Sequence, residues 1–408
     1  MEERKECNLG DYCDFQNGYA FKSSEFKTNG EYKIVKIKEL KDGLVKFFDD
    51  SASVDIHDIK EFEKYKIYRN DVLFALTGDP VSKPNPLSWV GRVSIYRSDE
   101  NALLNQRTCK IKKSDEIDNQ FLYYYFRQWK NFYALASKAT GSASQANIST
   151  NTIADTIIKL PPLPTQQKIA AILSSLDDKI ELNNKINTNL EQQAQALFKN
   201  WFVDFEPFGG KMPEGWKVGK LSEIADYLNG LAMQKFRPLE DEEGLPVLKI
   251  KEFRQGCYDE SSELCSPSKV KPEYIIHDGD VIFSWSGSLL VDIWCGGTCG
   301  LNQHLFKVTS QTYEKWFYYL WTKHHLDRFI FLAADKATTM GHIKREELDK
   351  AEVVIPDDKT YSKLTMTLSP IIDTIINNRV ENRRLSEIRD NLLPELMSGN
   401  INVEDITI

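Results

Sequence analysis

Pairs of polar and basic side chains occur at matching points in two parts of the sequence. Gln106 and Arg107 precede one predicted strand, and Gln303 and His304 precede another. An amide beside a basic group can donate hydrogen bonds to a base edge or to phosphate, so both pairs are candidates for contact with nucleic acid. Polar residues at the edge of a protein core would show the same pattern, and that interpretation stays open.

Two short segments of small residues could approach a phosphate closely. They are residues 77–79 (TGD) and residues 286–288 (SGS). Their hydroxyl and backbone N–H groups can donate to phosphate oxygens, although ordinary hairpin turns have the same composition. The candidates from these turns and the nearby loops are Thr77, Gly78, Ser286, Gly287 and Ser288, with Lys83, Asn85, Trp89 and Arg92 from residues 80–103, Ser142 and Gln145 from residues 141–147, and Lys344 from residues 338–344.

The sequence has no motif that would let the chain act as a catalyst by itself. It contains no GxxxxGK[ST] phosphate loop and no Asn/Asp-Pro-Pro-aromatic loop of the kind that adenine methyltransferases use. The segment PDDK at 356–359 resembles a nuclease carboxylate–lysine cluster, but acidic residues at a predicted helix start serve the helix dipole. The histidines at 57, 277, 304, 324, 325 and 342 lack metal-ligand spacing, and we expect structural thiols rather than zinc at Cys295 and Cys299.

The composition predicts a cytoplasmic protein of two or three domains. The chain has 408 residues, 41% of them apolar and 27% charged, and no apolar run is long enough to span a membrane. Its first ten residues are rich in charge and carry no apolar signal segment. The seven cysteines make an odd number, which favours free thiols over a disulfide framework.

The charge leaves the question of a nucleic-acid partner open. The net charge of −8 argues against such a partner. Residues 1–160 nevertheless hold 24 Lys and Arg against 23 Asp and Glu, and residues 207–356 hold 18 against 22. Because neither segment is a basic tail, affinity for DNA would need local patches, neutral donors or partner subunits.

The chain contains a tandem duplication of about 200 residues. Residues 9–20 (LGDYCDFQNGYA) match residues 221–232 (LSEIADYLNGLA), and the segment KIKE recurs with the same neighbours. LNQ at 104–106 recurs at 301–303, and FLYYYF at 121–126 corresponds to WFYYLW at 316–321, whose aromatic residues we expect in the core. The loop at 80–103 corresponds to a loop of only 12 residues in the second copy, at 289–300. Two similar scaffolds with different loops are expected to recognise different targets.

Each copy is predicted to be a β-rich domain with one helical segment. In the first copy the strands are expected at 32–37, 71–76, 92–96 and 109–113, with turns at NG, DG and TGD. A helix is expected at 118–129, followed by a glycine- and serine-rich connector at 139–147 and a closing strand within 156–164. The matching close of the second copy lies within 351–358.

Each copy ends in a long helix, and the apolar residues of both helices repeat every seven residues. The first helix is expected to open after Pro164 with Thr165 as its N-cap, and the second after Pro356. Asparagines interrupt both repeats at corresponding positions, which fixes register in paired helices. The seam consists of Ile169, Leu173, Leu176, Ile180, Asn183, Asn187, Leu190 and Leu197 in one helix, and of Leu364, Leu368, Ile371, Ile375, Asn378, Asn382, Leu385 and Leu392 in the other.

Matched seams predict that the two helices pair with each other, although each could instead pack separately on its own domain. Antiparallel pairing would place the two domains at opposite ends of a rod roughly 55–60 Å long, facing the same side. Dimeric DNA readers use such an arrangement for half-sites that lie about one helical turn apart. The helices would then act as a ruler.

Three segments of the sequence resemble type I restriction–modification specificity subunits. Residues 160–205 are similar to the central helical region of that family, residues 213–230 to the start of its second target recognition domain, and residues 382–401 to its distal helical region. The resemblance implies an α+β fold with target recognition domains at 1–160 and 207–356. The helical regions at 161–206 and 357–408 would pack as an antiparallel coiled coil.

The resemblance also implies a function. The chain would be a non-catalytic subunit that reads a split, asymmetric DNA target, one half per domain. Adenine-N6 methyltransferase subunits would dock beside the helices and a translocating endonuclease would join them, so S-adenosylmethionine, ATP and magnesium would belong to these partners. Because the first domain starts close to Met1, we expect a shortened N-terminal docking segment.

Two other classes of function stay open at this point. The acidic charge would suit a coiled-coil adaptor whose twin domains bind proteins or peptides. A nuclease or methyltransferase in its own right is disfavoured because the motifs are missing.

Overall fold

The computed structural model describes residues 4–112, 114–335 and 343–406. The chain forms two compact units, one made of residues 1–178 with 387–408 and the other of residues 179–386. Each unit combines one of the predicted globular domains with part of both long helices. The sequence predicted four segments, two domains and two helical regions, which are divided where the secondary structure changes along the chain. The two units are instead divided according to which residues pack against one another.

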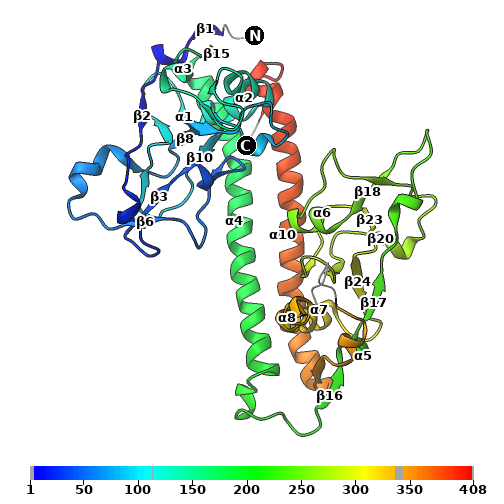
Figure 1. Ribbon diagram of the computed structural model, residues 1–408. Helices are drawn as coiled ribbons and strands as arrows, with labels where there is room; N and C mark the ends of the chain where they lie inside the picture. The colour runs from blue at the N-terminus through cyan, green and yellow to red at the C-terminus, as the bar shows by residue number, and fades with distance from the viewer. Residues whose placement is uncertain (1–3, 113, 336–342, 407–408) are drawn as a thin grey trace. The chain divides into compact units, whose positions relative to one another are not determined.

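A six-stranded sheet carries the core of the first unit (Figure 1). Strand β8 (Val72–Ala75) is buried at all four positions because alternate side chains enter two different cores. Val72 and Phe74 pack with the aromatic residues of helix α1 (Asn119–Arg127). The strand order is β2 (Phe15–Asn17), β12 (Thr108–Ile111), β8, β10 (Val93–Ile95), β5 (Leu44–Val45) and β4 (Leu40–Lys41).

A second sheet and one strand pair complete the framework of this unit. The second sheet has the order β6 (Ser53–Val54), β3 (Tyr32–Val35), β11 (Ala102–Leu104) and β7 (Lys66–Ile67). Strand β1 (Lys5–Asn8) pairs with β15 (Ile157–Leu160), the last strand before the first long helix. The predicted strands at 32–37, 71–76, 92–96 and 109–113 and the closing strand are thus confirmed as β3, β8, β10, β12 and β15.

Short helices cover the larger sheet, as the sequence predicted for residues 118–129. Helix α1 begins after Asp118, whose carboxylate accepts a hydrogen bond of 2.8 Å from the backbone N–H of Phe121. The aromatic cluster of residues 121–126 is largely buried in the core, and so is its counterpart at 316–321, as predicted. Helices α2 (Trp129–Ala136) and α3 (Thr150–Ala154) complete this layer.

The second unit repeats the topology of the first, which confirms the duplication (Figure 1). Both β3–β11 and their counterparts β18–β23 are parallel pairs inside otherwise antiparallel sheets. One sheet has the order β17 (Asp226–Asn229), β24 (Leu305–Thr309), β21 (Val281–Ser284) and β22 (Leu290–Ile293), and the other β19 (Leu264–Cys265), β18 (Leu245–Leu248), β23 (Cys299–Leu301) and β20 (Ile275–Ile276). The remaining elements are the pair β16 (Lys217–Lys220) and β25 (Glu352–Ile355), with helices α5 (Leu221–Ile224), α6 (Ile250–Gln255), α7 (Lys315–His324), α8 (Leu326–Asp335) and α9 (Glu346–Asp349).

The repeated Asn-Gly dipeptide marks a close backbone contact rather than the predicted turn. A Cβ atom on Gly18 would lie 2.1 Å from the carbonyl oxygen of Asn105, and one on Gly230 would lie 2.3 Å from that of Asn302. The residue after each glycine forms a parallel bridge to the same asparagine. Only glycine leaves room for this approach of two backbones.

Two polar contacts recur in both units and explain further repeated residues. Lys110 lies 2.9 Å from Asp71, and Lys307 lies 2.8 Å from Asp280 in the second unit. The glutamate of each KIKE segment is buried and accepts a hydrogen bond from a serine hydroxyl, which gives a buried carboxyl oxygen a partner inside the fold. These shared residues hold the scaffold together.

The two long helices are α4 (Leu163–Phe202) and α10 (Asp358–Ser398). The prediction that Thr165 caps the first helix is wrong, because α4 already begins at Leu163 and contains Pro164. Proline fits the first turn of a helix, where a backbone N–H has no intrahelical partner. The second helix begins as predicted, after Pro356, and Asp357 caps it by accepting a hydrogen bond of 3.0 Å from the N–H of Thr360.

The helices pair antiparallel within each unit (Figure 1). In the second unit, Asn183 donates to Asn382 at 2.9 Å and Asn378 donates to Asn187 at 2.8 Å. A later residue of α4 thus contacts an earlier residue of α10, as in an antiparallel pair. In the first unit, Arg389 of α10 binds Asp177 of α4 at 2.7 Å. Every predicted seam residue is buried or half-buried.

Each helix also packs on the domain that precedes it. Ile169 and Leu173 enter the core of the first unit, and Leu364 and Leu368 enter that of the second. Pairing and packing on the domains, which the sequence left as alternatives, therefore occur together. In the part of the chain that the structure describes, no helix has the length and apolar character needed to cross a membrane.

Candidate nucleic-acid interface

The predicted turn at residues 77–79 is a strand in its first two residues. Strand β9 (Thr77–Gly78) pairs with β14 (Ala146–Asn147), which forms a hairpin with β13 (Thr140–Gly141). The glycine- and serine-rich connector at 139–147 therefore folds as a hairpin that pairs with β9. The Thr77 hydroxyl donates to the side-chain amide oxygen of Asn147 at 3.0 Å and links the two strands to each other. The strand at Thr77–Gly78 exists because it pairs with residues about seventy positions further along the chain, and local sequence does not reveal such a pairing.

This hairpin brings several predicted residues of the first unit together. Thr77, Gln106, Arg107 and Gln145 line one open hollow of about 420 Å³, together with Asn147. The side chains of Gln106, Arg107 and Gln145 are exposed. The hollow thus presents amide and guanidinium donors, the groups that read base edges or bind phosphate.

Tyr19 borders the same surface, and sequence reasoning did not single it out. Its backbone carbonyl accepts a hydrogen bond of 2.9 Å from the N–H of Gln106, and its side chain is 38% exposed. Its ring packs edge-on against Phe21 and Phe62. The only signal in the sequence is a difference between the copies, because Leu231 occupies the equivalent position.

The equivalent residues of the second unit are bonded to one another. The Ser286 hydroxyl lies 3.0 Å from Nδ1 of His304, and Nε2 of His304 lies 3.4 Å from the amide nitrogen of Gln303. The indole of Trp285 lies against the same imidazole, with ring centroids 6.4 Å apart. The second unit therefore presents a linked hydroxyl–imidazole–amide group where the first presents separate donors.

The other predicted residues of the second unit lie around this group. Gly287 and Ser288 line a separate hollow with Arg254, whose guanidinium donates to the Ser288 hydroxyl at 3.0 Å. Lys344 is exposed and follows Ile343, whose N–H donates to the carbonyl of Trp285 at 3.2 Å. Residues 338–342 of the predicted connector lie outside the described residues.

The long loop of the first unit is partly used to hold itself together. Asn85 is exposed and caps a short turn by accepting from the N–H of Leu87, while Lys83 stays exposed. Arg92 is half-buried and donates to the carbonyl oxygens of Leu87 and Ile37. Burial lowers the pKa of this guanidinium. The placement of Arg92 indicates a structural role, and Ser142 likewise accepts from the backbone of Gln145 at the hairpin tip.

The cysteine pair at 295 and 299 has the properties of structural thiols. Burial raises the pKa of Cys295 to about 11 and that of Cys299 to about 12, so both stay protonated near neutral pH. Among the described residues, no group of three His, Cys, Asp or Glu side chains is placed to hold a metal ion.

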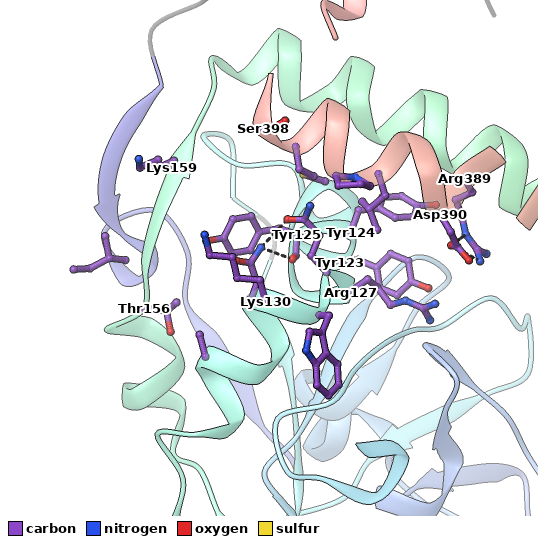
Figure 2. A pocket seen from close by; sticks show the side chains of 18 of the residues that line it. Tyr123, Tyr124, Tyr125, Arg127, Lys130, Thr156, Lys159, Arg389, Asp390 and Ser398 are labelled. Carbon is purple, nitrogen blue, oxygen red and sulfur yellow. Dashed lines mark hydrogen bonds and ion pairs between the residues drawn. The ribbon is translucent and has the colours of Figure 1, made fainter. Parts of the chain in front are cut away.

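A larger hollow of the first unit, about 1150 Å³, lies elsewhere and contains none of the predicted DNA contacts. Figure 2 shows Arg389 and Asp390 on the helix along one side and Lys159 on the strand at the other. Helices α1 and α2 form its floor with Tyr123, Tyr124 and Trp129, and the Trp129 side chain is 58% exposed. Such an open, partly apolar hollow suits contact with a protein better than contact with DNA.

Comparisons with known proteins identify the family to which the chain belongs. The family described as the type I restriction modification DNA specificity domain matches residues 1–192 and again residues 213–388. The chain belongs to this family. It is a specificity subunit, the non-catalytic component of a type I restriction–modification complex.

Individual relatives agree with this assignment, and one solved structure matches the fold. The chain is 29% identical over 323 residues to the type I restriction enzyme MjaIX specificity subunit of Methanocaldococcus jannaschii, covering 74% of this chain and 73% of the relative. It is 26% identical over 352 residues to the HindI specificity subunit of Haemophilus influenzae, covering 66% and 74%. The crystal structure of the type I restriction–modification S subunit from M. genitalium matches the fold with a TM-score of 0.59 and 16% identity, over 97% of this chain and 96% of that one.

Proposed function

We propose that this specificity subunit binds a bipartite, asymmetric DNA target and reads one half with each recognition domain. The observation that carries the proposal is the pair of equivalent but chemically different surfaces on one repeated scaffold. The first surface has Gln106, Arg107 and Gln145 as separate exposed donors. The second has Ser286 and His304 bonded to each other. Different donors at equivalent places would select different bases.

We further propose that methyltransferase and endonuclease subunits dock on this chain and perform the chemistry. The relatives are named as subunits of type I restriction enzymes, which supports the existence of such partners. S-adenosylmethionine, ATP and magnesium would be bound by those partners. The hollow between α1, α2 and the end of α10 is a suitable surface for one of them, because it is large, partly apolar and free of the DNA candidates.

The paired helices would set the distance between the two half-targets. A helix rises about 1.5 Å per residue, so seven extra residues in both helices would lengthen the rod by roughly 10 Å, or about three base pairs. Seven residues also preserve the seam, because the apolar pattern repeats with that period. An unaltered gap in the target of such a variant would contradict the ruler.

Methylation of a host genome tests the proposal. The chain is co-expressed with its methyltransferase subunit in a strain without other adenine methylation, and the complex is recovered by affinity purification. Sequencing of N6-methyladenine should then show a two-part motif with a fixed gap. An unmethylated genome, in the presence of a complex whose methyltransferase is active with a known specificity subunit, would refute the proposal.

A further inference from the structure

Arg107 is an exposed guanidinium that the protein itself does not use. In the described part of the chain its side chain has no hydrogen-bond or ion-pair partner. Other arginines are held by the fold: Arg379 binds Asp292 and Glu191, and Arg92 binds backbone carbonyls. An arginine without a protein partner on a rigid surface is available to a ligand.

The backbone around Arg107 is fixed although its side chain is not. The Arg107 carbonyl accepts from the N–H of Leu76 at 2.9 Å, and the N–H of Gln106 donates to the Tyr19 carbonyl at 2.9 Å. The next residue, Thr108, is fully buried, and its hydroxyl donates to the Asn105 carbonyl at 2.8 Å. The base of the side chain is thus held in place, which reduces the entropy lost when the side chain binds.

The neighbours of Arg107 suit a base edge better than a phosphate. Gln106 and Gln145 line the same hollow, and the Asn147 amide nitrogen remains able to donate because its oxygen accepts from Thr77. No lysine lines this hollow. A site built for the DNA backbone gathers several cations, whereas amides beside one arginine match the donor and acceptor groups of base edges.

We propose that Arg107 reads a guanine in the half-target of the first recognition domain. Both arms of its guanidinium would donate to O6 and N7 of that base in the major groove, a pairing that suits the planar fork of arginine. The inference rests on the proposed DNA-binding function. The equivalent residue of the second domain is His304, whose imidazole is bonded to Ser286 and Gln303, so that domain offers no free guanidinium at this place and would read its half-target with a different set of donors.

The test replaces Arg107 in the complete methyltransferase complex and sequences the methylated motif. Arg107→Gln should relax one guanine position of one half-target, with adenine newly accepted, because glutamine pairs with adenine. Discrimination at that position should fall by about 5- to 150-fold, and the other half should stay unchanged. Arg107→Ala, as a second variant, should relax the position without a preference for adenine.

Lys112→Gln is the control for charge, because it removes one exposed positive charge just beyond the other end of β12, where the lysine lies 3.7 Å from Asp14 and away from the hollow, and it should keep the motif. Two results would overturn the inference. One is an unchanged motif in both Arg107 variants. The other is uniformly weaker binding to all sequences with a salt dependence reduced by about one ion, which would make Arg107 a phosphate contact. Absence of any two-part motif from the wild-type complex would instead contradict the proposed function.

Discussion

Arg389 of α10 and Asp177 of α4 form an ion pair of 2.7 Å in the first unit, where the second unit has an apolar pair at the equivalent positions. The two long helices correspond with an offset of 195 residues, so the counterparts are Ala194 and Ile372, both in the second core. The hydroxyl of Tyr124 also donates to Asp177, at 2.6 Å. The duplication therefore supplies a natural replacement for the ion pair.

Arg389→Ala should destabilise the first unit by about 2–3 kcal/mol. The Arg389 side chain is 18% exposed and that of Asp177 is 20% exposed. Removing one partner of a fully buried pair costs roughly 3–5 kcal/mol, and the remaining contact with water lowers that value here. The double variant Arg389→Ala with Asp177→Ile copies the second unit and should come within about 1 kcal/mol of the wild type. The residual cost arises because Tyr124 loses its acceptor.

Native-state hydrogen exchange measures this effect where it occurs, because it reports the free energy of opening of individual segments. The backbone amides of residues 173–178 and 387–393 are the probes, and amides of the second unit serve as the internal control. The expected result is strong loss of protection in the single variant and near recovery in the double. A double variant as destabilised as the sum of its single changes would refute the reasoning, because the two side chains would then act independently.

Three further predictions follow from buried contacts. Gly18→Ala should cost about 2–4 kcal/mol, because the new Cβ would lie 2.1 Å from the Asn105 oxygen; a thermal midpoint equal to the wild type would contradict this crowding. Burial lowers the pKa of His325 from 6.5 to about 4, so the unfolded chain binds more protons between these values and stability should fall as the pH drops from about 6.5 to 4. In His325→Asn the thermal midpoint should depend less steeply on pH over this range. An equally steep dependence would exclude this residue as the cause. Asn378→Leu alone should lower the free energy of unfolding, because it leaves the Asn187 side-chain oxygen without its donor. Leu at both positions should raise that free energy by about 1–2 kcal/mol in a denaturant titration. The opposite order of stabilities would contradict the role of the two asparagines as a hydrogen-bonded pair.

The fold was largely predictable because the duplication shows many of the strands and helices twice, so that each copy supports the prediction made for the other. Strands such as Val72–Ala75 and the helix at Asn119–Arg127 appeared in both copies, and the seven-residue repeat predicted the pairing of α4 and α10. The start of α4 at Leu163 does not follow from the proline pattern, because a proline can end a preceding strand and is equally accepted in the first turn of a helix. The hairpin around Gln145 was missed because its partner strand is distant in the sequence.

The site was predictable as a set of residue types but not as a geometry. Gln106 and Arg107 could be identified because a polar and basic pair precedes a strand in both copies, and the structure places Thr77 and Gln145 beside them. The involvement of Arg92 in the loop's own hydrogen bonds could not be read from its position. Neither could the bond between Ser286 and His304, since it joins two segments that only the folded sheet brings together.

Exchange of one recognition domain tests most directly whether each domain reads its own half of the target. Residues 207–356 are replaced by the corresponding domain of another specificity subunit with a known target, and the methylated motif of the resulting complex is sequenced. We expect one half of the motif to become that of the donor, while the other half and the gap remain as in the wild type. A motif that changes in both halves, or in neither, would contradict independent reading by two domains.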